Sequence, residues 1–481
     1  MNYKIIINIL GKVLMLEAAC FLVPLITALV YREREGLMYL AVALGTVLIG
    51  FLISRRKKFD QVYYAREGFV MVSLSWIVLS VVGAVPFMLT GEIPGFFNAL
   101  FETVSGFTTT GASIVEDVES LSHTSLIWRS FTHWVGGMGV FVLLLAILPM
   151  AGGYNIHLMR AESPGPTVGK LVPKLRETAL ILYAIYFAMT LLELALLTLA
   201  RMPFFDALCI TFGTAGTGGF GIKGDSLGGY SVPIQAIVTV FMILFGVNFN
   251  AYFFLIGKYK KEIFKMEEVR WYFIIIALAI GAITVNIAGY FGNIFLSFHH
   301  AAFQVGSIIT TTGYSTVDFD AWPQLSRTIL VLLMFIGACA GSTGGGIKVS
   351  RVVILIKSVI QEIGYFIHPR SVKTMRMDGR GVDKHVLNNI RVFLITYVLI
   401  FAGSMLLLSL NNLDGETNFT AVAATFNNIG PGLAQVGPAR NFNLYSDLSK
   451  AVLTFDMLAG RLELYPVLLL FMPSVWQRSK N

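Results

Sequence analysis

The amino-acid sequence predicts an all-α polytopic membrane protein in which four pseudo-symmetric units follow an extra N-terminal helix pair. The first observation is compositional: of the 481 residues, 56% are hydrophobic and only 13% are charged. Soluble domains average about 45–50% apolar and about 25% charged residues, so the soluble enzyme classes are excluded. The second observation is that a short motif of threonine and glycine recurs four times between long apolar stretches.

Ten apolar stretches are long enough to be candidate transmembrane helices, since about 20 apolar residues cross a bilayer. They lie at residues 5–31, 37–54, 68–90, 125–150, 178–200, 233–257, 271–291, 328–358, 391–410 and 449–472. We expect the first two to form the extra helix pair, in residues 1–67. The others divide into four units, at residues 68–150, 151–257, 258–358 and 359–481.

Charged residues in the connections orient these stretches. Most of the 36 Lys and Arg residues lie at the two ends of the chain or in the segments 54–67, 151–176, 258–270 and 348–391, and the alternate connections carry acids instead. Cytoplasmic loops are enriched in Lys and Arg, so we expect both termini and these basic segments in the cytoplasm. The net charge of +8 therefore reflects membrane topology, and no nucleic-acid partner is expected.

Four of the outer connections carry a semi-apolar stretch that is too short to cross a membrane, followed by a turn rich in Thr and Gly. In the first three, the same spacing separates an Ala from a Gly, in the pairs Ala99–Gly111, Ala207–Gly219 and Ala301–Gly313. In the fourth, Gly430 and Gly432 compete for the equivalent place. Internal repeats of this kind predict four helix–re-entrant hairpin–helix units.

Four re-entrant hairpins can meet around one axis and point rings of backbone carbonyls at a cation, replacing its hydration shell. Glycine suits such turns because inward-facing carbonyls require backbone angles that side chains resist. The segment Thr311–Tyr314 is the closest match in this chain to the TVGYG sequence of potassium-channel filters. The alternative is that these turns are ordinary outer loops with capping glycines.

A run of small residues interrupts the eighth apolar stretch at Gly341–Gly346, followed by Lys348. Each Gly costs about 1 kcal/mol relative to Ala in a helix interior, so we expect the helix to break there. A seam of close helix packing, which also uses small residues, is the alternative.

Arg461 lies within the last apolar stretch. A charge at the centre of a bilayer costs about 2.5–3.5 kcal/mol, so an intramembrane Arg is a candidate functional residue. The alternative is a structural pairing with Asp456, with Glu463 or with loop carbonyls.

These motifs together resemble the Trk/Ktr/HKT superfamily of potassium transporters, and most closely its bacterial Trk-type uptake membrane subunits. The likeness covers essentially the whole chain and includes TTTGA at 108–112, TGGF at 217–220, TTTGY at 310–314, NNIGPGL at 427–433 and GRLELYP at 460–466. The resemblance implies four M1–P–M2 pore units that select K⁺, in the plasma (inner) membrane of a bacterium. It also implies a homodimer and a cytosolic ring of nucleotide-binding regulatory subunits.

The resemblance assigns roles to particular residues. The implied K⁺ filter consists of Thr109, Thr110, Gly111, Thr217, Gly218, Gly219, Thr311, Thr312, Gly313, Asn427, Asn428, Ile429 and Gly430. The fourth turn departs from the Thr-Thr-Gly pattern, which leaves its coordinating atoms open. The implied gate is an intramembrane loop with two cations beside it: Gly341, Ser342, Thr343, Gly344, Gly345, Gly346, Lys348 and Arg461.

Potassium is then the only metal expected, as substrate ion at the filter. No covalent cofactor is expected, and a nucleotide is expected only on the regulatory partner, which the basic segments 151–176 and 348–391 would receive. The sequence contains no Ser/His/Asp set, metal-ligand cluster or P-loop, so we expect no enzyme activity.

An ion-coupled secondary symporter is the main alternative function, but such folds contain inverted repeats, whereas the repeats here share one orientation. A non-transporting scaffold would leave the four hairpins without a role.

Overall fold

The described part of the protein is mostly helical. The computed structural model describes residues 1–55, 65–139, 175–256, 260–370 and 374–477. Six helical segments in the described part are long and apolar enough to cross a membrane. They are the pair α1 (Tyr3–Cys20) and α2 (Leu22–Tyr31), followed by α3 (Gly36–Ser54), α4 (Ala65–Thr90), α9 (Leu175–Leu199), α13 (Glu267–Phe291) and α17 (Lys384–Leu408). The chain is therefore a multi-pass membrane protein.

Four shorter helices follow α4, α9, α13 and α17. They are α5 (Phe96–Phe107), α10 (Phe204–Gly216), α14 (Ile294–Ile309) and α18 (Gly415–Phe426). At about 1.5 Å of rise per residue, none of them can cross a hydrocarbon core of about 30 Å. Each leads through a loop to another helix: α6 (His123–Gly137), α11 (Val232–Phe245), α15 (Gln324–Ile336) and α19 (Asp447–Arg461).

Side-chain caps determine where several of these helices begin. The Asp414 carboxylate accepts a hydrogen bond from the backbone N–H of Thr417 at 2.8 Å and a second one from the Thr417 hydroxyl. These two hydrogen bonds hold the pKa of Asp414 below its usual range. Ser122 and Ser446 cap α6 and α19 in the same way. A cap satisfies an N–H group that has no partner within the helix, and so favours starting the helix at that residue.

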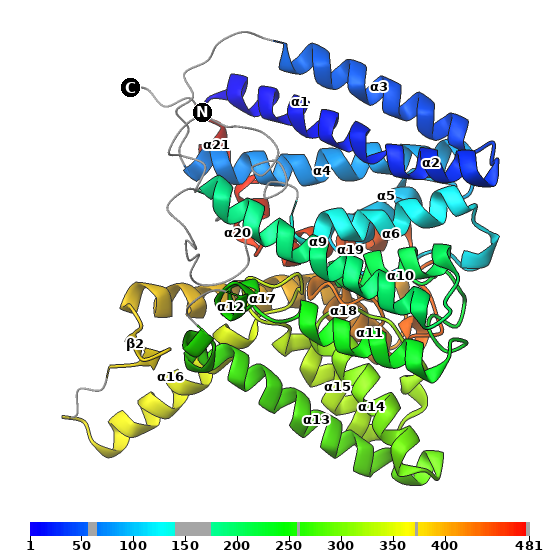
Figure 1. Ribbon diagram of the computed structural model, residues 1–481. Helices are drawn as coiled ribbons and strands as arrows, with labels where there is room; N and C mark the ends of the chain where they lie inside the picture. Colours follow the sequence, from blue (N-terminus) through cyan, green and yellow to red (C-terminus); the bar gives the residue numbers. More distant parts are fainter. Residues whose placement is uncertain (56–64, 140–174, 257–259, 371–373, 478–481) are drawn as a thin grey trace.

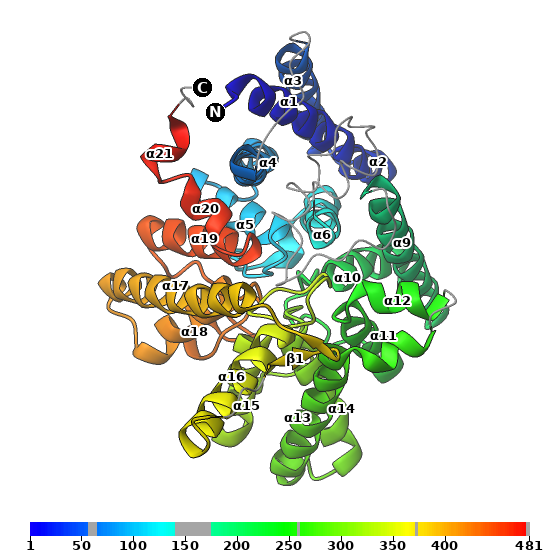
Figure 2. The ribbon, with the colours of Figure 1, turned by 90° about the vertical axis from the view of Figure 1, so that its left-hand side faces the viewer.

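The helices are arranged around a common centre. Viewed along that centre, α4–α6, α9–α12, α13–α16 and α17–α20 occupy four successive sectors (Figure 2). Helices α1 to α3 lie outside this circle and pack against α4 and α6. Glu33, in the turn between α2 and α3, accepts hydrogen bonds from the N–H groups of His123 (2.9 Å) and Thr124 (2.8 Å). These bonds fasten the N-terminal helices to the start of α6.

Two segments that were predicted as continuous helices are broken, so those predictions were wrong. The stretch 233–257 is divided into α11 and α12 (Phe249–Ile256), which are bent by 93° relative to each other. The stretch 449–472 stops at the end of α19 and resumes as α20 (Tyr465–Leu469). Positive φ angles of 56° at Glu463 and 68° at Leu464 turn the backbone out of the helical path.

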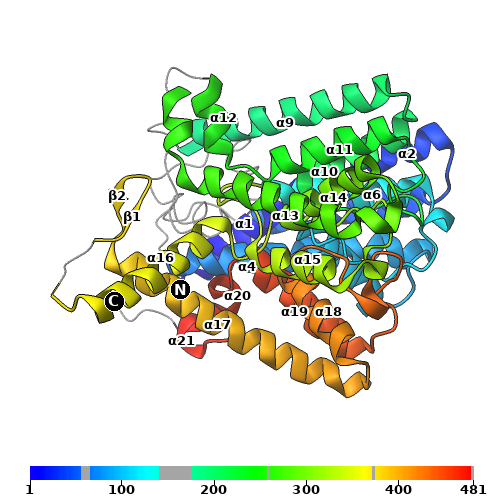
Figure 3. The ribbon, with the colours of Figure 1, turned by 90° about the horizontal axis from the view of Figure 1, so that it is seen from below.

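The eighth apolar stretch is also broken, between α15 and α16 (Val349–Ile367). The break begins at Gly337, before the predicted Gly341, because Gly337 has a φ of 73° that ends α15. Helix α16 leads to a hairpin of β1 (Arg376–Met377) and β2 (Arg380–Gly381), and both lie at one end of the molecule (Figure 3). The N-terminus and α21 (Pro473–Trp476) lie at that same end (Figure 1).

Single 3₁₀ turns complete the described elements: Val118–Ser120, Lys260–Lys265, Phe319–Ala321, Ser409–Asn411 and Ala434–Val436. Three sequence predictions fall largely outside the described residues. They are the basic segment 54–67, the second half of the candidate span 125–150 and nearly all of the basic segment 151–176.

Candidate functional site

The turns that follow the four short helices share one backbone geometry. A residue with left-handed φ follows the end of each short helix within two positions, and a glycine with positive φ lies two positions further on. The pairs are Thr109 (55°) and Gly111 (78°), Thr217 (55°) and Gly219 (74°), Thr311 (59°) and Gly313 (89°), and Asn428 (55°) and Gly430 (102°). Left-handed φ is unusual for a β-branched residue such as Thr. Strain of this kind, about 1–3 kcal/mol per residue, is concentrated at functional sites.

The residue between each pair also forms the same hydrogen bond in all four turns. Its N–H donates back to the end of the short helix, as expected for a helix that ends with a left-handed residue. The bonds are Thr110 to Ser105 (2.9 Å), Gly218 to Gly213 (2.8 Å), Thr312 to Ser307 (2.8 Å) and Ile429 to Ala424 (2.8 Å). The four turns therefore have the same backbone conformation despite their different sequences.

The four glycines also bring the turns together into a closed ring. A Cβ atom added to Gly111 would overlap the carbonyl oxygen of Gly218, which lies in the second turn. The same relation links Gly219 to the carbonyl of Thr312, and Gly313 to that of Ile429. A Cβ on Gly430 would lie 2.8 Å from the carbonyl oxygen of Thr110, so the fourth turn contacts the first and the ring is closed.

The fourth turn, which the sequence left ambiguous, uses Gly430. Gly432 has no positive φ, and its N–H bonds to the carbonyl of Val436 at 2.7 Å. The Asn428 side chain donates to the hydroxyl of Thr110 at 3.0 Å, which ties the fourth turn to the first. The Asn427 side chain accepts a hydrogen bond from Tyr397 at 3.1 Å. Both asparagine side chains therefore hold neighbouring segments, and the backbone of this turn faces the ring.

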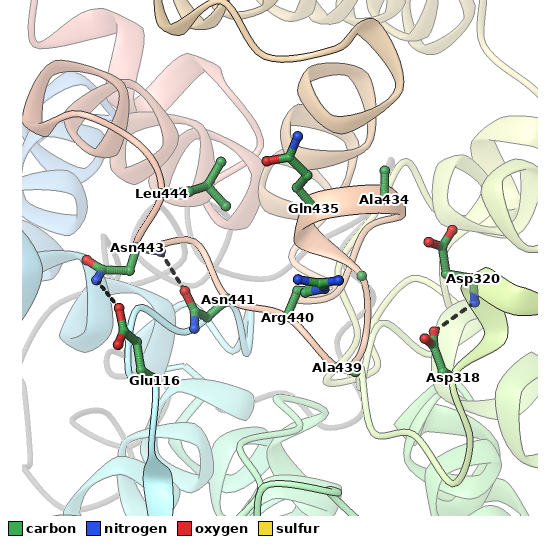
Figure 4. A pocket seen from close by; sticks show the side chains of 11 residues that line it. Glu116, Asp318, Asp320, Ala434, Gln435, Ala439, Arg440, Asn441, Asn443 and Leu444 are labelled. Carbon is green, nitrogen blue, oxygen red and sulfur yellow. Dashed lines mark hydrogen bonds between the residues drawn. The ribbon is translucent and has the colours of Figure 1, made fainter.

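Two adjoining cavities lie on one side of the ring. The smaller, of about 150 Å³, is lined by all four glycines, and the larger, of about 760 Å³, shares Glu116 and Arg440 with it. Arg440 lies between Glu116 and the pair Asp318 and Asp320 (Figure 4). Asp320 is paired with Arg327 at 2.8 Å, whereas Arg440 has no ion-pair partner among the described residues.

The broken part of α15–α16 lies against the other side of the ring. The N–H of Gly345 donates to the Thr311 hydroxyl at 2.6 Å. A Cβ on Gly345 would lie 2.6 Å from the carbonyl oxygen of Asn427, and one on Gly344 would lie 2.8 Å from that of Thr310. The predicted loop residues are thus in direct contact with the third and fourth turns, and no side chain fits between the loop and the ring.

Both cations predicted beside the loop bind its carbonyl groups. The Lys348 ammonium donates to the carbonyls of Gly344 and, at 3.1 Å, of Gly345. The Arg461 guanidinium donates to the carbonyl of Thr343 at 2.8 Å and to those of Gly136 and Gly137 at the end of α6. Of the three structural pairings considered for Arg461, the one with loop carbonyls is therefore present.

The two acids considered as partners of Arg461 have other contacts. Asp456 accepts a hydrogen bond from the Ser404 hydroxyl at 2.7 Å. Glu463 forms an ion pair with Arg351 at 2.6 Å.

Glu268, at the start of α13, anchors the loop at both ends, and sequence reasoning missed it. One oxygen of its buried carboxylate accepts hydrogen bonds from the N–H of Ala340 at 2.7 Å and from that of Ser350 at 3.1 Å. The kink between α11 and α12 provides further support, because the N–H of Phe249 donates to the carbonyl of Gly341 at 3.0 Å. The sequence signal for this role was an acidic residue shortly before the apolar stretch 271–291. It did not reveal the role, because the partners of Glu268 are distant in the sequence.

A buried ion pair supports the first turn. Arg129 in α6 contacts Glu102 in α5 at 2.7 Å, and both side chains are almost fully buried. Glu102 also accepts hydrogen bonds from the N–H of Ile114 (3.0 Å) and the hydroxyl of Ser113 (2.9 Å). The pair therefore holds the segment that follows Gly111.

No group of three or more His, Cys, Asp or Glu side chains that could hold a metal ion occurs within the residues described. The adjacent histidines of α14 bind protein partners: His299 bonds to Gln235 at 2.7 Å and His300 to Thr316 at 2.9 Å.

Comparison with known proteins agrees with this arrangement. Residues 38–478 match the family described as TrkH, cation transport protein. The Trk system potassium uptake protein TrkH of Salmonella typhimurium is 37% identical, over 99% of this chain and 100% of the relative. TrkG of Escherichia coli, also named a Trk system potassium uptake protein, is 34% identical over 99% of each chain.

A solved structure has the same fold. The crystal structure of the potassium transporter TrkH from Vibrio parahaemolyticus superposes with a TM-score of 0.89 at 33% identity, over 99% of this chain and 100% of that one. Similarity over nearly the full length of both sequence and structure identifies this chain as a transport protein that belongs to the TrkH family.

Proposed function

We propose that this protein carries K⁺ into the cell through the ring formed by the four glycine turns, passively and down the electrochemical gradient. The closed circuit of turns at Gly111, Gly219, Gly313 and Gly430 is the observation that supports this function most directly. A circuit of this kind can present backbone carbonyls from four directions to one cation and replace its hydration shell. The relatives are named potassium uptake proteins, which supports K⁺ as the ion.

The membrane potential supplies the driving force for uptake. Each monovalent cation gains about 2.3 kcal/mol per 100 mV on moving to the negative side. Uptake by this route needs no chemical energy source within the chain. The proposed filter consists of the thirteen residues of the four turns named above, from Thr109 to Gly430, including Ile429.

The loop Gly341–Gly346 is the proposed gate. Its contacts with Thr311 and Asn427 support this role, since a loop that packs against two of the four turns can obstruct ions leaving the ring. Lys348 and Arg461 hold the loop by its carbonyls, and their positive charges oppose a cation at this point.

Removing the Arg461 guanidinium should therefore raise K⁺ flux. In proteoliposomes we expect Arg461→Ala to increase K⁺ flux several-fold, because it removes hydrogen bonds to carbonyls from a charged donor, each worth about 1.5–3 kcal/mol. Flux and selectivity equal to wild type would contradict a barrier role for Arg461.

The names of the relatives, which refer to a Trk system, support a proposal about the assembly. We propose a homodimer in the bacterial inner membrane with both termini in the cytoplasm. There the basic segments 151–176 and 348–391 would dock a cytosolic nucleotide-binding regulatory subunit.

A reversal-potential measurement tests the proposed function. The purified protein is placed in a planar bilayer with K⁺ on one side and Na⁺ on the other, at equal pH. We expect current without any further driving ion, with a reversal potential that favours K⁺. Equal permeability to the two cations would refute a K⁺ filter. Transport that requires a Na⁺ or H⁺ gradient would instead indicate the ion-coupled symporter.

A further inference from the structure

His133 of α6 is completely buried between the first and second turns. Its Nδ1 atom lies 2.7 Å from the carbonyl oxygen of Gly106, near the end of α5. Its Nε2 atom lies 3.3 Å from the backbone N–H of Phe220, the residue after Gly219. The imidazole also packs on the Phe220 ring, with centroids 4.3 Å apart. One side chain therefore joins the backbones of two repeats behind the ring.

The two contacts determine the protonation state of this histidine. A carbonyl oxygen can only accept, so Nδ1 carries a proton and donates to Gly106. A backbone N–H can only donate, so Nε2 has no proton and accepts from Phe220. The side chain is thus the neutral imidazole with its proton on Nδ1, which offers one donor and one acceptor.

Phe220 is held from the opposite side as well. The hydroxyl of Tyr314, which follows Gly313 in the third turn, lies 3.2 Å from the carbonyl oxygen of Ile210 and 3.4 Å from that of Phe220. Tyr314 is completely buried. The backbone directly after Gly219 is therefore attached through its N–H to the first repeat and through its carbonyl to the third.

We propose that His133 and Tyr314 are positioning residues that set the width of the ring at the second turn and thereby determine how well it distinguishes K⁺ from Na⁺. This inference rests on the proposed function. Na⁺ is smaller than K⁺, and a ring accepts it well only if its carbonyls can move inward. A segment attached on both sides resists that movement, so removing either attachment should mainly lower selectivity and leave conduction intact.

The test compares variants of the full-length chain. His133→Phe keeps an aromatic ring against Phe220 but removes both hydrogen bonds, and Tyr314→Phe removes only a hydroxyl. Trp134→Phe is the matched control, since this neighbour in α6 loses a ring hydrogen bond of 3.2 Å to Thr190, which lies in α9. Each purified variant is checked for a monodisperse gel-filtration peak, and its reversal potential is measured with K⁺ and Na⁺ on opposite sides.

We expect His133→Phe to lower the K⁺/Na⁺ permeability ratio about tenfold, which for a monovalent ion is a shift of about 59 mV in reversal potential. Tyr314→Phe should shift it in the same direction by a smaller amount, and Trp134→Phe should match wild type. His133→Asn, which keeps an N–H for Gly106, should recover part of the ratio.

Wild-type ratios in both His133→Phe and Tyr314→Phe would overturn the inference, as would an equal loss in Trp134→Phe. If His133→Phe yields no folded protein, the Tyr314→Phe result decides alone. A wild-type protein without K⁺ selectivity would instead refute the proposed function itself.

Discussion

Substituting Gly219 by Ala tests the ring most directly. The added Cβ would overlap the carbonyl oxygen of Thr312 in the third turn and lie 2.9 Å from its carbonyl carbon. Two costs follow. The φ of 74° places an L-residue in the left-handed region, at about 1–2 kcal/mol. Overpacking against rigid backbone adds about 1–3 kcal/mol. The total is about 2–5 kcal/mol, and its overpacking part is relieved only if the second and third turns move apart.

Isotopic K⁺ flux in proteoliposomes, together with the reversal potential in mixed K⁺ and Na⁺, measures the consequence. Since each 1.4 kcal/mol corresponds to a factor of ten, we expect Gly219→Ala to lower K⁺ flux, selectivity or both by at least about tenfold. Gly403→Ala is the control, because a Cβ at this position in α17 meets nothing within 4 Å. A folded Gly219→Ala protein with wild-type flux and selectivity would refute the reasoning, as would an equal defect in Gly403→Ala.

Three further predictions concern charged residues around the ring. Glu268→Ala should raise K⁺ flux several-fold because it frees both ends of the loop, whereas Glu268→Gln keeps the accepting oxygen and should stay near wild type; equal fluxes in the two variants would contradict an anchoring role. Arg440→Gln should increase K⁺ entry at about 0.01 M salt but not at about 1 M, where the Debye length falls to about 3 Å. The control is the exposed Arg34→Gln, whose K⁺ entry should equal wild type at both salt concentrations. Wild-type entry in Arg440→Gln at low salt would contradict an effect of this charge. Arg129→Met should destabilise the protein by about 3–5 kcal/mol because it leaves Glu102 buried without its partner. In the double variant with Glu102→Gln, the melting temperature in detergent should recover in part. No recovery would argue against the ion pair.

Much of the architecture could be predicted from the sequence, because it depends on local properties. The short helices before Gly111, Gly219 and Gly313 follow from the length of their apolar runs and from a repeated spacing. The break near Gly341 follows from the helix propensity of glycine. The bend after α11 and the end of α19 were not predicted in this way, because the breaks at Gly246–Asn248 and Leu462–Leu464 are short interruptions within otherwise long apolar stretches.

The partners of individual side chains could not be predicted either. Glu268 and His133 are unremarkable in the sequence, yet Glu268 holds both ends of a loop that is distant in the chain, and His133 joins backbone segments from two repeats. Arg461 was recognised as costly in a membrane, but the sequence left its partner open between two acids and loop carbonyls, and the structure shows hydrogen bonds to carbonyl groups.

The sequence by itself determined that this chain is a multi-pass membrane protein with four related glycine turns, since the transfer of each residue to lipid and the conformational freedom of each glycine are properties of short segments. Only the tertiary structure decided that the four turns close into a ring, that Gly430 and not Gly432 belongs to it, and that the loop after Gly337 lies against one side. Those outcomes depend on contacts between residues as distant as Thr110 and Asn428. Contacts of that kind form only when the whole chain has packed, so no local pattern records them.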